Sequence, residues 1–255
     1  MNINRRKEIL NLLLQRGSVK VSVLAERFAV NDVTIRRDLK YLAEKHGVTL
    51  TYGGAFIDTP SSTYPIAELT LAAKRRQQYE EKQIIARKAA ALIENGDTIA
   101  LNAGSTVEYV LDYLPAAVQR LNVLTLSLGV AVKASSLPQA TLFLPGGKVR
   151  PESTEMCGSE TERFLRQFNV DKVFFGAAAV HLKRGVTHPV PEEVSTNRLI
   201  LDIAAKRYLV CDSSKFDGVS LQHIADLSFF DAIIADDKLP ESYRTYCQLN
   251  GITIL

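Results

Sequence analysis

Residues 21–39 read VSVLAERFAVNDVTIRRDL, and this stretch decides the fold of the N-terminal part of the chain. It contains a short helical pattern over 21–29 and a second, longer one over 32–42. Asn31 precedes the second pattern and is a residue type that caps helix N-termini. Two helices joined by a tight turn, with the small Ala25 at their crossing point, are typical of a helix-turn-helix.

The second of these helices has one apolar face and one polar face. Ile35, Leu39 and Leu42 recur at helical spacing, so we expect them to face inward. The residues predicted to project outward are Thr34, Arg36, Arg37 and Lys40. An outward basic face suits the major groove, where arginine binds guanine edges or phosphates. Three core helices of a larger domain with a charged exterior would give the same pattern.

The sequence on either side of this stretch extends the same module. A helix is predicted over 4–15, ended by Gly17, and a hairpin is predicted from the alternating strand 48–52 and the turn at Gly53. That hairpin would be the wing of a winged helix-turn-helix. The predicted DNA contacts are Ser22, Asn31, Thr34, Arg36, Arg37, Lys40 and Tyr52.

Charge separates the two parts of the chain. Residues 1–56 contain ten Lys or Arg and five Asp or Glu, whereas the remainder contains 21 basic and 23 acidic residues. A basic module attached to a nearly neutral one suits a polyanion binder, although a basic face is often merely a solvated one. The predicted domains are a DNA-binding module over 1–57, with its motif at about 20–39, a Pro- and Ser-rich linker over 58–73 and a second domain over 74–255.

The second domain alternates helices and short apolar strands. A long helix is predicted over 74–94. The predicted strands are 98–101, 122–126, 141–144, 173–175, 207–211, 232–235 and 252–255. The predicted helices between them include 106–114, 159–168, 192–205 and 241–250. This alternation predicts an α/β fold, with a largely parallel sheet covered by helices on both faces.

Three loops of this domain have the composition of ligand-binding loops. Such loops gather beyond the carboxyl ends of parallel strands. The segment 102–106 reads NAGST, 127–129 reads SLG and 144–150 reads LPGGKVR. Glycines let the backbone approach a ligand, and hydroxyl groups at a helix N-terminus favour an anion. Ordinary turns have similar compositions, so the argument depends on the three loops converging on one edge.

The N-terminal motif resembles the DNA-binding segment of the DeoR family of bacterial regulators. The specific part is TIRRDL at 34–39, followed by YGGA at 52–55. Three positions depart from the family pattern. Ala29 stands where the turn usually has glycine, His46 where glycine usually ends the third helix, and Leu50 where the wing usually has arginine. The first change implies backbone strain, and the last removes a DNA contact.

The resemblance extends over the second domain. NAGST, LPGG and DSSKF (212–216) resemble the three characteristic segments of the DeoR effector domain, and GVT at 185–187 with the acids and arginine that follow resembles a fourth. The resemblance implies a fold like that of ribose-5-phosphate isomerase and an effector that is a phosphorylated sugar. Our predicted effector contacts are Asn102, Gly104, Ser105, Thr106, Ser127, Gly146, Gly147, Lys148, Glu193 and Lys215.

Departures in this domain cluster around the predicted pocket. Asn102 replaces the commoner aspartate, and Asn197 replaces a lysine that would be a phosphate cation. The segment 176–181 reads GAAAVH and lacks the acidic residues usual near its end. His181 is there either a ligand contact or a packing histidine. These changes bear on which effector is bound.

Two other functions fit parts of the pattern. A sugar-phosphate isomerase needs a base beside the carbonyl carbon, and the alanine run removes the acidic residues that would supply it. Glu192 and Glu193 remain, without an evident partner. A DNA-binding protein whose second domain only oligomerises is the other alternative. We therefore expect a regulator and no catalytic residues.

The remaining expectations concern partners and location. Cys157, Cys211 and Cys247 are widely spaced and form no metal-ligand pattern, so we expect no metal, no cofactor and a reducing cytoplasm. No apolar run of about 18 residues is found, so no transmembrane helix is expected. The predicted partners are double-stranded operator DNA, a phosphorylated sugar and further copies of the chain, as a dimer or tetramer.

Overall fold

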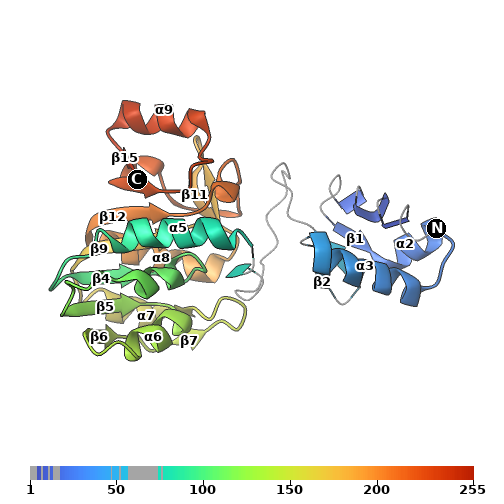
Figure 1. Cartoon of the computed structure of the whole chain (residues 1–255). Helices are drawn as coiled ribbons and strands as arrows, with labels where there is room; N and C mark the ends of the chain where they lie inside the picture. The colour runs from blue at the N-terminus through green and yellow to red at the C-terminus, as the bar shows by residue number, and fades with distance from the viewer. Residues whose placement is uncertain are drawn as a thin grey trace. The chain divides into compact units, whose positions relative to one another are not determined.

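The computed structural model describes residues 5, 6, 8–10, 12, 13, 18–46, 48–51, 53–56, 74, 75 and 77–255. The chain forms two compact units, one within Met1–Ile66 and the other within Ala67–Leu255 (Figure 1). Each unit is described by itself. The predicted linker over 58–73 lies outside the described residues.

The first unit is a small winged helix-turn-helix. Of the predicted first helix, the described residues are helical. The elements that follow are β1 (Ser18–Lys20), α2 (Val21–Arg27), α3 (Asp32–His46), β2 (Thr49–Thr51) and β3 (Gly54–Phe56). The hairpin β2–β3 is the predicted wing. Strand β1 was not predicted; it pairs antiparallel with β3 and makes a three-stranded sheet in the order β1-β3-β2.

The core of this unit is formed by the predicted inward positions. Ile35, Leu39 and Leu42 are buried, together with Leu24 of α2. The core also contains Ile9, Leu12, Leu13, Val21, Val48 and Ala55. Asp38 is buried as well, and it accepts hydrogen bonds from Arg5 Nε (2.6 Å) and Arg6 Nε (2.7 Å). Those two arginines therefore attach the first helix to α3.

The turn between α2 and α3 closes by a Schellman motif. Val30 N donates to Ala25 O (3.0 Å) and Ala29 N donates to Glu26 O (3.2 Å). The residue at the left-handed position of this motif is Ala29, with φ 48°. Glycine adopts that conformation without the steric conflict that a Cβ atom causes. The strain predicted for this turn is therefore present.

The second unit is built on a sheet of seven parallel strands, one for each strand predicted from the sequence. The strands are β4 (Thr98–Leu101), β5 (Leu121–Thr125), β6 (Ala140–Phe143), β9 (Val170–Gly176), β12 (Ala204–Val210), β14 (Ala232–Ile234) and β15 (Thr253–Ile254). Their order is β15-β14-β12-β9-β4-β5-β6, which can be followed in Figure 1. The predicted α/β class with a parallel sheet is confirmed.

Helices cover both faces of the sheet. On one face, α5 (Tyr79–Ala90), η1 (Val107–Tyr113) and α6 (Leu128–Ser135) pack against side chains such as Ile99 and Val123. On the other, α7 (Ser159–Leu165), α8 (Pro191–Asp202) and α9 (Glu241–Asn250) pack against neighbours in the same strands, such as Ala100 and Leu124. Buried strands with apolar residues on both faces explain the continuous apolar runs in the sequence.

The chain reverses direction across the sheet between β4 and β9. It moves outward from β4 through β5 to β6, then returns to β9 on the other side of β4 and continues through β12 to β15. In parallel sheets the crevice at such a switch point, beyond the carboxyl ends of the strands, is where ligands bind. The fold therefore marks the ends of β4 and β9 as the place to look for a site.

Several predicted boundaries are corrected. The long helix over 74–94 is interrupted at Gln78, whose φ of 48° is left-handed, so α5 begins only at Tyr79. The segment 106–114 forms the 3-10 helix η1 instead of an α-helix, and Pro115 disfavours helical backbone at the residue before it. Helix α6 was not predicted.

Short strands and 3-10 turns in the connections were also missed. They are β7 (Lys148–Val149), β8 (Met156–Cys157), β10 (Ala179–His181), β11 (Gly185–His188), β13 (Gln222–Ala225), η2 (Ser213–Lys215) and η3 (Leu227–Phe229). Strands β10, β11 and β13 form an antiparallel sheet of their own.

Candidate DNA-reading helix and effector site

The outward face of α3 carries the predicted basic residues. Arg36, Arg37 and Lys40 are exposed, and Thr34 is half-buried. Asn31 caps the helix: its Oδ1 accepts from Thr34 N (2.9 Å) and from Thr34 Oγ1 (2.7 Å). Asn31 and Thr34 thus hold the helix start in place, and the arginines one turn further on are presented to a partner.

The remaining predicted DNA contacts are Ser22 and Tyr52. Ser22 is exposed near the start of α2, whereas Tyr52 lies outside the described residues. A hollow of about 560 Å³ lies among β1, the start of α2 and the wing. Its lining includes Lys20, Ser22 and Thr51. Leu50, where the DeoR pattern has arginine, is 46% exposed on the wing and presents no charge.

The predicted effector residues lie in loops that follow strands of the parallel sheet. Asn102–Thr106 follows β4, Ser127 follows β5, Gly146 and Gly147 follow β6, and Lys215 lies in η2 after β12. Because all these strands are parallel, their carboxyl ends lie at one edge of the sheet. The structure therefore gathers the three loops at one edge, as the convergence argument requires.

Asn102 joins the two central strands just beyond their ends. Its Oδ1 accepts from Gly176 N (2.8 Å) and its Nδ2 donates to Gly176 O (3.0 Å), so the amide takes the place of a further pair of ladder bonds between β4 and β9. The same Nδ2 donates to Asn197 Oδ1 of α8 (3.0 Å). Both asparagines are buried. The two departures from the family pattern thus form one neutral amide pair.

Glu155 extends this pair into a buried acidic cluster. Asn197 Nδ2 donates to Glu155 Oε1 (2.6 Å) and to the carbonyl of Glu193 (2.9 Å). Glu155 is 2% exposed. Burial and then the negative charge of Glu193 raise the pKa of Glu155 well above its ordinary value. The cluster therefore favours a protonated carboxyl, which both donates and accepts hydrogen bonds.

Glu193 is held from three sides. It accepts from Arg150 Nη1 (2.9 Å) and Ser153 Oγ (2.5 Å), and His188 Nε2 lies 3.3 Å from its second oxygen. Its neighbour Glu192 pairs with Lys148 (2.7 Å) at the surface, where both side chains are more than half exposed. Of the two cations predicted near the glycine pair, Arg150 thus reaches the buried cluster and Lys148 pairs with Glu192.

The small residues of the neighbouring loops are fixed by close contacts. Ser127 is buried and caps α6, accepting from Val130 N (3.3 Å). Gly147 has φ of 128°, and a Cβ atom there would lie 2.4 Å from Thr161 Oγ1. That hydroxyl donates to Gly146 O (2.8 Å). Gly147 is therefore required by the local packing, whatever the loop binds, whereas a Cβ atom on Gly146 would meet open space.

A second group of cations and acids lies around the start of α5 and η2. Lys82 is 1% exposed, and its Nζ donates to Lys74 O (2.6 Å) and Gln77 O (2.5 Å). Burial lowers the pKa of Lys82 to about 8, opposed by the attraction of Asp212. Asp212 is buried and caps Ser214 N through Oδ1 (3.1 Å), while Oδ2 has no hydrogen-bonding partner among the described residues.

Sequence reasoning missed the residues that complete the polar cluster. Glu155, Ser153 and His188 carried no motif, since they lie in connections whose strands were not predicted. Buried Glu108 and its partner Arg75 were missed because both fell within predicted amphipathic helices. The described residues contain no group of three or more His, Cys, Asp or Glu side chains that could hold a metal ion.

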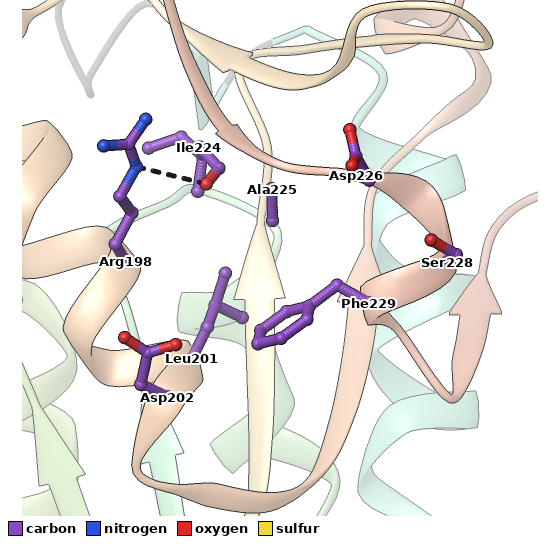
Figure 2. A pocket seen from close by; sticks show the side chains of 8 residues that line it. All are labelled: Arg198, Leu201, Asp202, Ile224, Ala225, Asp226, Ser228 and Phe229. Atoms are coloured by element: carbon purple, nitrogen blue, oxygen red, sulfur yellow. Dashed lines mark hydrogen bonds between the residues drawn. The ribbon is translucent and has the colours of Figure 1, made fainter.

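Another hollow lies away from the strand carboxyl ends. It has a volume of about 280 Å³ and is lined by the end of α8, β13 and η3. Figure 2 shows Arg198 at one side, bonded to the Ile224 carbonyl (3.2 Å), with Leu201 and Phe229 in the lining. Arg198 is thus used to bind backbone carbonyls of the small antiparallel sheet.

A winged helix-turn-helix with an exposed basic helix, joined to an α/β domain with a polar loop-built site, defines a DNA-binding regulator with a sensor domain. Residues 5–61 match the DeoR-like helix-turn-helix domain, and residues 77–237 match the DeoR C-terminal sensor domain. The chain belongs to the DeoR family of transcriptional regulators. DNA and a small-molecule effector are therefore its partners.

Curated relatives align along nearly the whole chain. The glycerol-3-phosphate regulon repressor of Escherichia coli K12 is 32% identical, covering 93% of this chain and 92% of the relative. The lactose phosphotransferase system repressor of Streptococcus mutans is 33% identical, covering 92% and 94%. The regulator IolR of Bacillus subtilis is 28% identical, covering 100% and 99%. These relatives are regulators, and the prediction that this chain is not an enzyme is confirmed.

Solved structures show a partial likeness of fold. A ribose 5-phosphate isomerase from Methanocaldococcus jannaschii has a TM-score of 0.39 and 16% identity, covering 68% of this chain and 66% of that chain. The eIF2B delta subunit from Chaetomium thermophilum has a TM-score of 0.45 and 19% identity, covering 63% and 57%.

Within the described residues, each helix is either too short or too polar to span a membrane.

Proposed function

We propose that this chain represses a carbohydrate-utilisation operon and that a phosphorylated sugar, bound at the carboxyl edge of the sheet, modulates operator binding. The observation that carries the proposal is the gathering of the predicted effector loops beside the β4–β9 switch point. The names of the relatives support the choice of ligand, since one is the repressor of a glycerol-3-phosphate regulon and another of a lactose phosphotransferase system.

The chemistry of the edge suits the phosphate group of a sugar phosphate. Gly104, Ser105 and Thr106 offer backbone amides and hydroxyls to a phosphate, with Lys215 as a cation. Asn102 and Asn197 are buried, and the Nδ2 atom of each donates two hydrogen bonds within the domain, so they support the strand ends beside the ligand. The proposed ligand is an effector, and the proposed mechanism includes no cofactor.

The proposed mechanism couples two states of the sensor domain to DNA. Helix-turn-helix regulators bind as symmetric oligomers that read paired half-sites, and we propose a dimer or tetramer working in the cytoplasm. An effector that binds one arrangement of the sensor domains better than the other shifts the population toward it. The recognition helices are then presented at a different spacing, which changes operator affinity.

The test is operator binding by the purified protein, using DNA from its own gene neighbourhood and a panel of sugar phosphates with their unphosphorylated counterparts. We expect one phosphorylated sugar to weaken binding. The double variant Ser105→Ala, Lys215→Ala should bind DNA normally and lose the response. The control variant, Ser228→Ala with Lys206→Ala, changes an exposed serine and a lysine at the other end of the strands and should respond like the parent.

Each outcome separates the candidate functions. A fragment that binds but responds to none of the compounds would support the alternative in which the second domain only oligomerises. The neutral amide pair of Asn102 and Asn197 is the observation that favours that alternative, because it leaves fewer charges for a phosphate. A double variant that still responds normally would place the effector outside the β4 and β12 loops.

A further inference from the structure

The outward face of α3 includes one large aliphatic side chain. Val33 is 66% exposed, in the first turn of the helix. Residues at positions i, i+3, i+4 and i+7 share a helix face, which places Val33 with Arg36, Arg37 and Lys40. The core residues Ile35, Leu39 and Leu42 lie on the opposite face of α3. The valine therefore lies on the same surface as the basic residues, at the N-terminal end of α3.

The position of this valine is well defined. Asn31 caps α3 through two hydrogen bonds to Thr34, so the start of the helix is fixed. A β-branched side chain in a helix has one strongly preferred rotamer. An exposed valine contributes little to the core of the unit, and it is a weaker helix former than alanine or lysine. Neither core packing nor helix propensity therefore accounts for a valine at this position.

We propose that Val33 packs against the 5-methyl group of a thymine in the major groove of the operator. The N-terminal residues of a recognition helix are the ones that contact base edges. The thymine methyl is the apolar group that base pairs expose in that groove. Val33 therefore specifies a thymine next to the base pairs read by the arginines. The inference rests on DNA binding by α3 and is independent of the effector.

The chemistry of valine makes the preference sharp. Its side chain neither donates nor accepts a hydrogen bond, so it cannot read the polar edge of any base or bind a phosphate. It discriminates only by the presence of a methyl group. The same contact should then accept 5-methylcytosine better than cytosine, since the two bases differ by that methyl alone.

The experiment begins with selection of binding sites from a random duplex pool by the full-length protein. Each thymine of the selected site is then replaced singly by deoxyuridine, which removes only the 5-methyl group. Affinities are measured for the parent, for Val33→Ala and for Val23→Ala. Val23 is the matched control, because it is a valine of the same unit, 51% exposed, on α2 instead of α3.

For the parent and Val23→Ala we expect one thymine in each half-site at which deoxyuridine weakens binding about fourfold, as loss of one buried methyl group implies. Val33→Ala should bind the thymine site more weakly and be indifferent to the methyl there. At that position, 5-methylcytosine should bind the parent better than cytosine.

Two results would overturn the proposal. One is a deoxyuridine scan with no affected thymine; the other is an affected thymine to which Val33→Ala remains equally sensitive. A selection that enriches no sequence would contradict specific reading by α3 altogether. That failure is distinct from failure of the effector proposal, which appears as bound DNA that does not respond to sugars. Melting temperatures of the variants verify that the exposed substitutions leave the fold intact.

Discussion

Arg75 holds the carboxylate of Glu108 by two parallel hydrogen bonds, from Nε to Oε2 (2.7 Å) and from Nη2 to Oε1 (3.0 Å). Glu108 is almost fully buried in η1, which follows the loop of Asn102–Thr106. A Cβ atom on Gly129 would lie 2.0 Å from the same carboxylate. The pair therefore joins the segment before α5 to the start of η1. The close approach of Gly129 places the start of α6 against the same carboxylate.

Breaking this pair should destabilise the sensor domain. Arg75→Met leaves a buried carboxylate without its cation, and because the arginine is 45% exposed we expect a loss of about 2 kcal/mol. Thermal and urea unfolding measure it. Adding Glu108→Gln should recover part of the loss. The control Lys133→Met removes a partly exposed pair with Asp112 and should cost less than about 1 kcal/mol. Equal effects in the two single variants would contradict this account.

Glu155 should make stability depend on pH. Its pKa is raised in the folded protein by burial and by Glu193, so the folded state binds more protons than the unfolded chain above the ordinary glutamate pKa of about 4.3. Stability is therefore lost as pH rises from there toward the folded pKa. Glu155→Gln keeps an acceptor for Asn197 and removes the titration.

The unfolding free energy of Glu155→Gln relative to that of the parent should grow as pH is raised from about 5, by at most about 1.4 kcal/mol per pH unit. Urea unfolding at four pH values measures this difference. Glu192→Gln, which changes an exposed acid paired with Lys148, should show a flat difference over the same range. A Glu155→Gln curve parallel to that of the parent would mean that the carboxyl is already ionised in the fold.

Replacing Ala29 by glycine should change the stability of the winged unit in the opposite direction from replacing Ala25 by glycine. Because its φ is 48°, Ala29→Gly should relieve strain and stabilise the winged unit by about 0.5–1 kcal/mol. Ala25→Gly, within α2, should instead cost about 1 kcal/mol. Thermal unfolding of both variants tests the pair. If both glycines destabilise, the turn does not hold Ala29 in the left-handed region in solution.

The basic residues of α3 should separate into base readers and phosphate binders. Arg36→Ala or Arg37→Ala should weaken operator binding by about 1–3 kcal/mol where the arginine reads a base, with relaxed specificity at one position. Lys40→Ala should weaken binding to all sequences and reduce the slope of log affinity against log salt by about one. Fluorescence anisotropy at several salt concentrations provides both readouts. Unchanged affinity in both arginine variants would refute this recognition helix.

The sequence predicted the parts of the fold that repeat a simple pattern. Every strand of the parallel sheet contains a short apolar segment, although β9 and β12 begin earlier than predicted, in stretches that include charged residues. Asn31 and the apolar face of α3 follow standard helix rules. Gln78 could not be predicted to interrupt the helix over 74–94, since nothing in its residue type requires a left-handed backbone. The three-residue strands β1 and β10 are too short to show a period.

Sequence motifs marked only part of the candidate site. Asn102 and Gly147 lie in recognisable loops, and the structure places both at the carboxyl edge. Glu155 lies in a short hairpin without a motif, and its importance comes from partners that the sheet brings to it. Tertiary contacts bring the members of that cluster together, so no pattern of residues along the chain indicates it.

The hydrogen bond between Asn102 and Asn197 spans 95 positions of the chain, and this separation has a consequence for synthesis. Contacts so distant along the sequence form late and slowly, after the intervening strands have assembled. The winged unit, whose contacts are local, leaves the ribosome first and can fold at once. A partly made chain therefore carries a complete recognition helix before the polar cluster at the carboxyl edge of the sheet can form.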